Sequence, residues 1–126
     1  MKTLSVLIVD PDPNFREGLY NFLLSASYEK VDSAENYQTA LEKIRETEYD
    51  VVLLDAGSPL SAGRKVADRI ASSSPKAKVI LMAGFQEEQQ QNEQQQNDEA
   101  GNKAEYQYLI KATFARNLLY LLERDA

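Results

Sequence analysis

The sequence predicts an α/β protein in which five parallel strands form a doubly wound sheet with helices on both faces. Two observations lead to this fold class. Short apolar runs without polar alternation, such as "LSVLIV" and "VVLL", are typical of strands that are covered on both sides. Segments with apolar residues at helical spacing lie between such runs, and strand and helix alternate five times along 126 residues. A chain of this length is expected to form one domain, residues 1–126, around one core.

The first strand is predicted at residues 4–9, directly before Asp10. A helix should begin just after it, because Asp12 is a favoured N-cap residue and Pro13 is favoured at the first helical position. Apolar residues then recur at helical spacing, at Phe15, Leu19, Phe22 and Leu23. Pro11 separates the two acids, so we expect Asp10 to face the edge of the sheet while Asp12 starts the helix.

The middle of the chain is predicted to contain two strands, each followed by a helix. The strands are expected near residues 28–32 and at residues 51–54, and the second of them ends at Asp55. The two helices are indicated by their apolar positions, which are Tyr37, Leu41 and Ile44 in the first and Val66, Ala67 and Ile70 in the second.

The C-terminal part supplies the remaining two strands and a last helix. "KVILMA" at residues 78–83 predicts the fourth strand, and "YQYLI" at residues 106–110 predicts a fifth that ends at Lys111. The last helix is indicated by Phe114, Leu118, Leu121 and Leu122.

Several polar residues fall where these predicted strands end. Parallel sheets of this kind have right-handed crossovers, and they bind ligands beyond the carboxyl ends of their strands, at the point where the strand order reverses. Asp10, Asp55, Ala83 and Lys111 are at those ends. With the strand order 2-1-3-4-5, Asp10 and Asp55 would lie on adjacent strands. The sequence therefore predicts an acidic site with a lysine at this edge.

Composition restricts the chemistry of such a site. The chain has no cysteine and no histidine, which excludes disulfides, thiolate metal sites, histidine acid–base chemistry and most zinc sites. A formal net charge of -6 argues against direct binding of nucleic acid. No apolar run approaches the roughly 18 residues of a membrane span, and no secretory signal precedes the first strand. We therefore expect a cytoplasmic protein that uses carboxylate, lysine or hydroxyl groups, or that binds other proteins.

These strand-end residues resemble the signature of the receiver domain of bacterial two-component response regulators, and the resemblance covers essentially the whole chain. Asp10 matches the acid after the first strand, Asp55 the phosphoacceptor position after the third, and Lys111 the lysine after the fifth. The further matches are Pro59, Gly63 and Tyr108, the last at the aromatic switch position of the family. The fold implied by the resemblance is the flavodoxin-like receiver fold.

The resemblance implies phosphorelay signal transduction rather than turnover of a substrate as an enzyme. Asp55 would accept a phosphoryl group in the presence of Mg²⁺, and Lys111 would hold a phosphoryl oxygen. Asp10, Asp55 and the Gly57 carbonyl would bind the Mg²⁺, a hard cation that takes oxygen ligands. Because this chain has no histidine, a separate histidine kinase or phosphotransfer protein would supply the phosphoryl group. A downstream protein partner would receive the signal.

Three departures from the family pattern weaken parts of this machinery. Family members usually have two adjacent acids after the first strand; the second is Pro11 here, so weak Mg²⁺ binding is expected. The hydroxyl residue that usually ends the fourth strand is Ala83. A hydrogen bond to a charged group contributes about 1.5–3 kcal/mol, so we expect coupling to Tyr108 to be weaker by roughly ten- to hundredfold. Ala112 replaces the proline that usually follows Lys111, which predicts a trans peptide and a shifted loop.

A glutamine-rich segment at residues 86–101 falls where the family has its fourth helix. It contains the pentad EQQQN twice in tandem, at residues 88–92 and 93–97, and we interpret it as an insertion by local duplication. Glutamine and glutamate favour helices, so an extended polar helix is one interpretation, and disorder is the other. The fourth helix and the two elements after it form the usual dimer or partner face of receivers, so that face is expected to be altered.

Three functions remain open from the sequence. The first is a phosphoacceptor with impaired Mg²⁺ binding and switching, and the second is a pseudo-receiver that binds its partner without phosphorylation. The third is remote: Asp10-Pro11-Asp12 resembles the DxD motif of haloacid-dehalogenase-type phosphatases, in which Asp10 would be the nucleophile and Asp12 the general acid. The chain is short for that family. Both a stand-alone regulator and a domain cut from a longer protein are compatible with the sequence.

Overall fold

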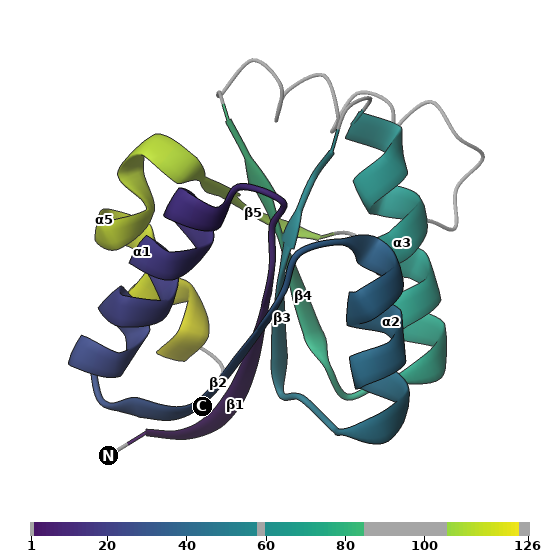
Figure 1. The fold of residues 1–126 in the computed structure, drawn as a ribbon, viewed down its shortest axis with the longest axis horizontal. Coiled ribbons are helices and arrows are strands. Elements are labelled where there is room, and N and C mark those ends of the chain that lie inside the picture. Colours follow the sequence, from purple (N-terminus) through teal and green to yellow (C-terminus); the bar gives the residue numbers. More distant parts are fainter. Residues whose placement is uncertain (1, 58–59, 85–105, 124–126) are drawn as a thin grey trace.

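The computed structural model describes residues 2–57, 60–84 and 106–123, and it contains the expected parallel sheet with helices on both of its faces (Figure 1). The strand order is β2-β1-β3-β4-β5, and all four neighbouring pairs are parallel. The fold class and strand order predicted from the sequence are therefore confirmed. The elements are β1 (Lys2–Val9), α1 (Pro13–Ser25), β2 (Tyr28–Ala34), α2 (Tyr37–Glu46), β3 (Val51–Asp55), α3 (Leu60–Ser73), β4 (Lys78–Ala83), β5 (Gln107–Ile110), a 3-10 turn η1 (Lys111–Thr113) and α5 (Phe114–Glu123).

Polar side chains fix where the first two helices begin. Asp12 is the N-cap of α1, where its side chain accepts a hydrogen bond from the Asn14 N–H, and Pro13 follows as the first helical residue. Asn36 caps α2 in the same way by accepting from the Thr39 N–H at 2.7 Å. Such caps satisfy N–H groups that have no partner inside the helix. The cap that the sequence predicted at Asp12 is confirmed.

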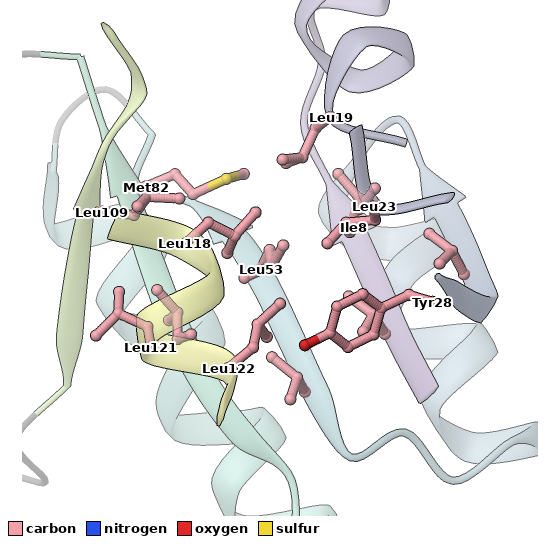
Figure 2. Close-up of a cluster of buried hydrophobic side chains, with 14 residues drawn as sticks. Ile8, Leu19, Leu23, Tyr28, Leu53, Met82, Leu109, Leu118, Leu121 and Leu122 are labelled. Carbon is pink, nitrogen blue, oxygen red and sulfur yellow. The ribbon is translucent and has the colours of Figure 1, made fainter. Parts of the chain in front are cut away.

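One core lies between the sheet and the pair α1 and α5, which cover the same face (Figure 1). Figure 2 shows this cluster, in which leucines of both helices and Tyr28 pack on alternate residues of the strands. Ile8, Leu53 and Met82 are strand residues of the cluster that are fully buried. Burial of apolar side chains on this scale is the main favourable contribution to folding.

A second core lies on the other face of the sheet, beneath α2 and α3. It uses the strand residues that the first core leaves out, such as Leu7, Leu54 and Leu81. The central strands are thus buried on both faces, which explains why their sequences show no polar alternation. Within the described ranges, no helix combines the length and the apolar character needed to cross a membrane.

Strand β2 differs from the sequence prediction, and two predicted features lie outside the described residues. Strand β2 continues to Ala34 instead of ending near residue 32, because Ser33 and Ala34 still pair with the last residues of β1. The glutamine-rich segment 86–101, predicted to be an extended helix or disordered, lies outside the described residues. Pro59, one of the family matches, lies outside them as well.

Candidate functional site

Three polar side chains meet beyond the carboxyl ends of the strands. Asp10 follows β1, Asp55 ends β3 and Lys111 follows β5. The Lys111 Nζ lies 2.8 Å from Asp10 Oδ2 and 2.6 Å from Asp55 Oδ1. Lys111 reaches across the end of β4, which lies between β3 and β5, and the small side chain of Ala83 ends that strand. The structure thus brings together the two acids and the lysine that the sequence placed at these strand ends.

The two carboxylates differ in their surroundings. Asp10 is fully buried, and its Oδ1 accepts a hydrogen bond from the Asp12 N–H at 2.9 Å. The side chain of Asp55 remains 18% exposed, so it is the carboxylate that a molecule in solution can reach. The Asp10 main chain is held by Arg16, whose Nη1 donates to the Asp10 carbonyl at 2.7 Å. Asp10 is therefore the buried carboxylate of the pair, and Asp55 is the accessible one.

The ammonium group of Lys111 is stabilised by this acidic pair. Burial alone would lower the pKa of Lys111, but hydrogen bonds and charge attraction from Asp10 and Asp55 outweigh burial, so its pKa lies above the ordinary value. Lys111 therefore stays protonated at neutral pH and offers its N–H groups to anionic oxygens. Its Nζ also lies 5.0 Å from the centre of the Phe15 ring, where a cation is attracted by the aromatic face.

Pro11 and Asp12 have separate places. Pro11 lines a pocket beside the site, and the Asp12 side chain points to the first turn of α1 as its cap. The expectation that Asp10 faces the site while Asp12 starts the helix agrees with these positions. The proline side chain has no group that can bind a metal or a proton, so Pro11 adds shape to the pocket without adding charge.

The pocket at this edge has a volume of about 500 Å³ and reaches from the start of α2 to the end of β4. Asp55 and Lys111 line it, and Pro11 and Ala83 contribute apolar walls. Because Ala83 is a lining residue, a larger hydroxyl residue at the end of β4 would extend into this pocket. The site is therefore open enough to admit a small anionic group next to Asp55.

The loop after β3 is shaped by two glycines. Gly57 has a φ of +84°, in the left-handed region that glycine adopts without strain. A Cβ on Gly63 would lie 2.3 Å from the Ala56 carbonyl oxygen, and the Gly63 N–H donates to that same oxygen at 2.9 Å. Only a residue without a side chain lets the first turn of α3 approach the end of β3 this closely.

Oxygen donors for a metal ion are present beside Lys111. The carboxylates of Asp10 and Asp55 contact Lys111 and are hard oxygen groups of the kind that Mg²⁺ prefers, and Gly57, whose carbonyl the sequence added to them, lines the same pocket as Asp55. Mg²⁺ is often held by one or two carboxylates together with substrate phosphates and water. Among the residues that the structure describes, no group of three or more His, Cys, Asp or Glu side chains is placed to hold a metal. The donors fit Mg²⁺ in kind, with two carboxylates in place of a larger acidic cluster.

Sequence reasoning missed three side chains that shape this site. Tyr37 and Phe15 were assigned to helix cores, and Arg16 was not singled out. The Tyr37 hydroxyl donates to the Asp55 carbonyl at 2.8 Å, while Phe15 and Arg16 hold Lys111 and Asp10 as described above. The signal that could have found Tyr37 is its place just beyond the carboxyl end of β2, the same edge of the sheet.

Tyr108, at the position of the family's aromatic switch, is partly buried and packs against the cluster beneath α2 and α3. That environment is what a strand aromatic with a structural role would have. The residue it was expected to couple with, Ala83, carries no hydroxyl. The role of Tyr108 in switching stays a prediction.

Comparisons with known proteins show the family of the chain. A sequence model of the response regulator receiver domain matches residues 6–119. The chemotaxis protein CheY of Listeria monocytogenes is 29% identical over 123 residues, which cover 98% of both chains. The transcriptional regulatory protein LnrK of Bacillus subtilis is 35% identical over 85 residues, which cover 67% of this chain and 39% of LnrK.

Solved structures show the same architecture. The response regulator TrrA from Thermotoga maritima, solved in complex with Mg²⁺-BeF, superimposes with a TM-score of 0.76 at 30% identity, covering 97% of this chain and 98% of TrrA. Receiver domains generally bind Mg²⁺. Because the receiver-domain model matches residues 6–119, this chain belongs to the response regulator receiver domains of two-component signalling.

Proposed function

We propose that this receiver domain accepts a phosphoryl group on Asp55 and passes the signal on by contact with other proteins, with weakened Mg²⁺ binding and switching. The observation that carries the proposal is the contact of one lysine with two strand-end carboxylates, because Lys111 Nζ lies within 2.8 Å of both Asp10 and Asp55. A histidine kinase or a phosphotransfer protein would be the physiological donor, and a downstream protein would be the target.

Asp55 is the nucleophile in this proposal. One oxygen of its carboxylate attacks the phosphorus atom of the donor, an O–P bond forms, and the bond from phosphorus to the leaving group breaks with its electron pair going to that group. No proton has to be removed from a carboxylate before it attacks, which suits a chain without histidine. The exposed part of Asp55 and the adjacent pocket give the donor access.

Lys111 and Asp10 support the transfer by their charges. The Lys111 ammonium, kept protonated by its acidic neighbours, turns from a carboxylate oxygen to a phosphoryl oxygen as negative charge builds up there. Asp10, Asp55 and the Gly57 carbonyl would hold Mg²⁺, which supplies neutralising positive charge to the phosphoryl oxygens when bound. Pro11 contributes no ligand, and this supports a lower Mg²⁺ affinity than a third carboxylate would give.

Intact-mass spectrometry tests this function directly. The chain is incubated with acetyl phosphate and Mg²⁺, and a mass increase of one phosphoryl group is expected. Asp55→Ala should abolish the increase, whereas Asp12→Ala, which removes an acid from the helix cap, should keep it. An adduct that persists in Asp55→Ala, or a wild-type chain that gains no mass, would contradict the proposal. Turnover of a generic phosphomonoester would instead favour the phosphatase-like use of Asp10 as nucleophile and Asp12 as general acid.

A phosphorylation-independent interaction module is the second candidate, and one observation favours it. Lys111 already compensates both carboxylates without any phosphoryl group, while Ala83 offers no hydroxyl to a phosphorylated Asp55. This candidate expects that a partner binds wild type and Asp55→Ala with the same affinity. A clear loss of affinity in Asp55→Ala would remove it.

A further inference from the structure

Tyr37 reaches from α2 to the loop that carries the phosphoacceptor. Its hydroxyl donates to the Asp55 carbonyl oxygen at 2.8 Å, and its ring packs against the buried cluster beneath α2 and α3. Tyr37 is also the first residue of α2, and Asn36 caps this helix, so the Tyr37 backbone is part of a regular element. Because the ring and the backbone are both fixed, the hydroxyl is presented to the loop from a rigid support.

The peptide bond after Asp55 is held at both of its ends. Its carbonyl oxygen accepts from Tyr37, and its N–H, which belongs to Ala56, donates to the Met82 carbonyl at 2.8 Å. The second bond continues the ladder between β3 and β4, whereas the first comes from outside the sheet. Together they fix the plane of this peptide. Without Tyr37, only the N–H end would be held by a partner in the sheet.

The Tyr37 hydroxyl also lies against Gly57, two residues further along. A Cβ added to Gly57 would be 2.5 Å from the Tyr37 Oη, which is closer than real Cβ atoms come to an oxygen. Gly57 already has a positive φ of +84°. Tyr37 therefore bounds the turn whose carbonyl we assign to Mg²⁺, and the turn and the tyrosine occupy complementary space.

The Tyr37 hydroxyl donates this hydrogen bond as a neutral phenol, so it holds the loop without adding a charge to the site.

We propose that Tyr37 is a positioning residue for phosphoryl transfer, which holds the peptide after Asp55 and the turn at Gly57 in the orientation that the reaction uses. This inference rests on the proposed function of Asp55 and adds the element that prepares the site. Tyr37 does not itself contact the transferred group. It acts through the loop, so its loss should affect the rate of transfer and the Mg²⁺ requirement more than the affinity for the donor.

Tyr37→Phe is the matched test, because it removes the hydroxyl and keeps the ring. Initial rates of phosphorylation by acetyl phosphate are measured by intact mass over a range of donor and Mg²⁺ concentrations. The loss of one hydrogen bond should lower the maximal rate by about five- to tenfold and raise the half-saturating Mg²⁺ concentration. The half-saturating donor concentration should stay within about twofold.

Tyr49→Phe is the control. The Tyr49 hydroxyl donates to Asp32 at 2.7 Å, and burial raises the pKa of Tyr49 as it does that of Tyr37, but Tyr49 precedes β3 and lies at its opposite end. This variant should phosphorylate like wild type. Equal slowing of Tyr37→Phe and Tyr49→Phe would show a general effect on stability and overturn the inference.

Amide hydrogen exchange gives a readout that needs neither donor nor Mg²⁺. In Tyr37→Phe, peptides that contain Ala56 and Gly57 should exchange at least about fivefold faster, since the loop loses one of its anchors. Exchange in the β1 and β4 strands should not change. Unchanged exchange in the loop would overturn the inference even if the variant were slower for another reason.

Gly57→Ala approaches the same contact from the loop side. The new methyl group collides with the Tyr37 hydroxyl, so this substitution should slow phosphorylation more in wild type than in the Tyr37→Phe background. Equal slowing in both backgrounds would overturn the inference. A wild-type chain that gains no phosphoryl group overturns the function of Asp55 and this inference with it. A reactive wild type with an equally reactive Tyr37→Phe overturns this inference alone.

Discussion

Lys111→Met removes the cation between two carboxylates and keeps a side chain of similar length over Phe15. The Lys111 ammonium lies 2.6–2.8 Å from one oxygen of each carboxylate, and at an effective dielectric constant of about 20 each such pair of unit charges attracts by about 6 kcal/mol. Desolvation of the three groups offsets much of this attraction. Removing one partner of a buried pair typically costs about 3–5 kcal/mol. Because the side chains of Lys111 and Asp55 keep 23% and 18% of their exposure, we expect a loss of about 3 kcal/mol in the free energy of unfolding.

The loss should depend on pH in a defined direction. Hydrogen bonds and charge attraction from Asp10 and Asp55 outweigh burial and hold the pKa of Lys111 above its ordinary value of 10.5, so the folded wild type keeps this proton when the unfolded chain loses it. The stability that Lys111 contributes is therefore fully present below about pH 10 and is lost as the pH rises further. Urea unfolding of wild type and Lys111→Met at several pH values should show a difference that is level near neutrality and shrinks at alkaline pH.

Lys76→Met is the control for the change in net charge, since Lys76 is exposed in the turn before β4, at the far edge of the sheet. It should leave stability within about 0.5 kcal/mol of wild type at every pH. A Lys111→Met variant as stable as wild type, or a difference that grows at alkaline pH, would refute the view that the Lys111 ammonium holds the two carboxylates together.

Three further changes test other parts of the structure. Gly63→Ala should destabilise the fold by about 1–3 kcal/mol in urea unfolding, because the new Cβ would collide with the backbone of Ala56 after β3. Gly18→Ala should stabilise the fold by about 0.5–1 kcal/mol, because nothing lies within 4 Å of the new atom and alanine favours the helix. Ala83→Thr restores a hydroxyl to the pocket and should tighten beryllofluoride binding in the presence of Mg²⁺ by roughly tenfold or more, as titrated by tyrosine fluorescence; unchanged binding would mean that position 83 does not limit the site. Burial raises the pKa of Tyr28 and of Tyr37 to about 12. Because the folded chain keeps these protons when the unfolded chain loses them, the contribution of the two tyrosines to the free energy of unfolding should be level below about pH 10 and fall between about pH 10 and pH 12.

The parts of the fold that the sequence could predict are those encoded by local pattern. Apolar runs marked the central strands because both faces of those strands are buried, and Asp12 with Pro13 marked a helix start because capping is a local interaction. Strand β2 was harder to delimit. It lies at the edge of the sheet and buries only Tyr28, Val31 and Ala34, so it shows neither a continuous apolar run nor a strict alternation, and Ser33 and Ala34 look like loop residues until they are paired with β1.

The candidate site was predictable where main-chain topology alone determines proximity. Asp10 and Asp55 follow adjacent parallel strands, so the strand order is sufficient to bring them together. The partner of the Tyr37 hydroxyl could not be predicted, because helical spacing assigns a tyrosine to an apolar face and says nothing about where its oxygen ends. Arg64 of α3 is a similar case: it is a charged residue that is only 6% exposed, and its burial depends on tertiary packing.

The phenylalanine rings near the site have a consequence for how Lys111 can move. The ammonium lies over the ring of Phe15 in α1. The rings of Phe15 and Phe114 pack edge-to-face with their centroids 5.6 Å apart, and those of Phe114 and Phe22 do so with their centroids 5.1 Å apart. The rings form a continuous aromatic bridge from the lysine to the helix that follows it in the chain. A shift of Lys111 would thus disturb the ring packing between α1 and α5. These helices cover the face of the sheet opposite to the cluster that contains Tyr37.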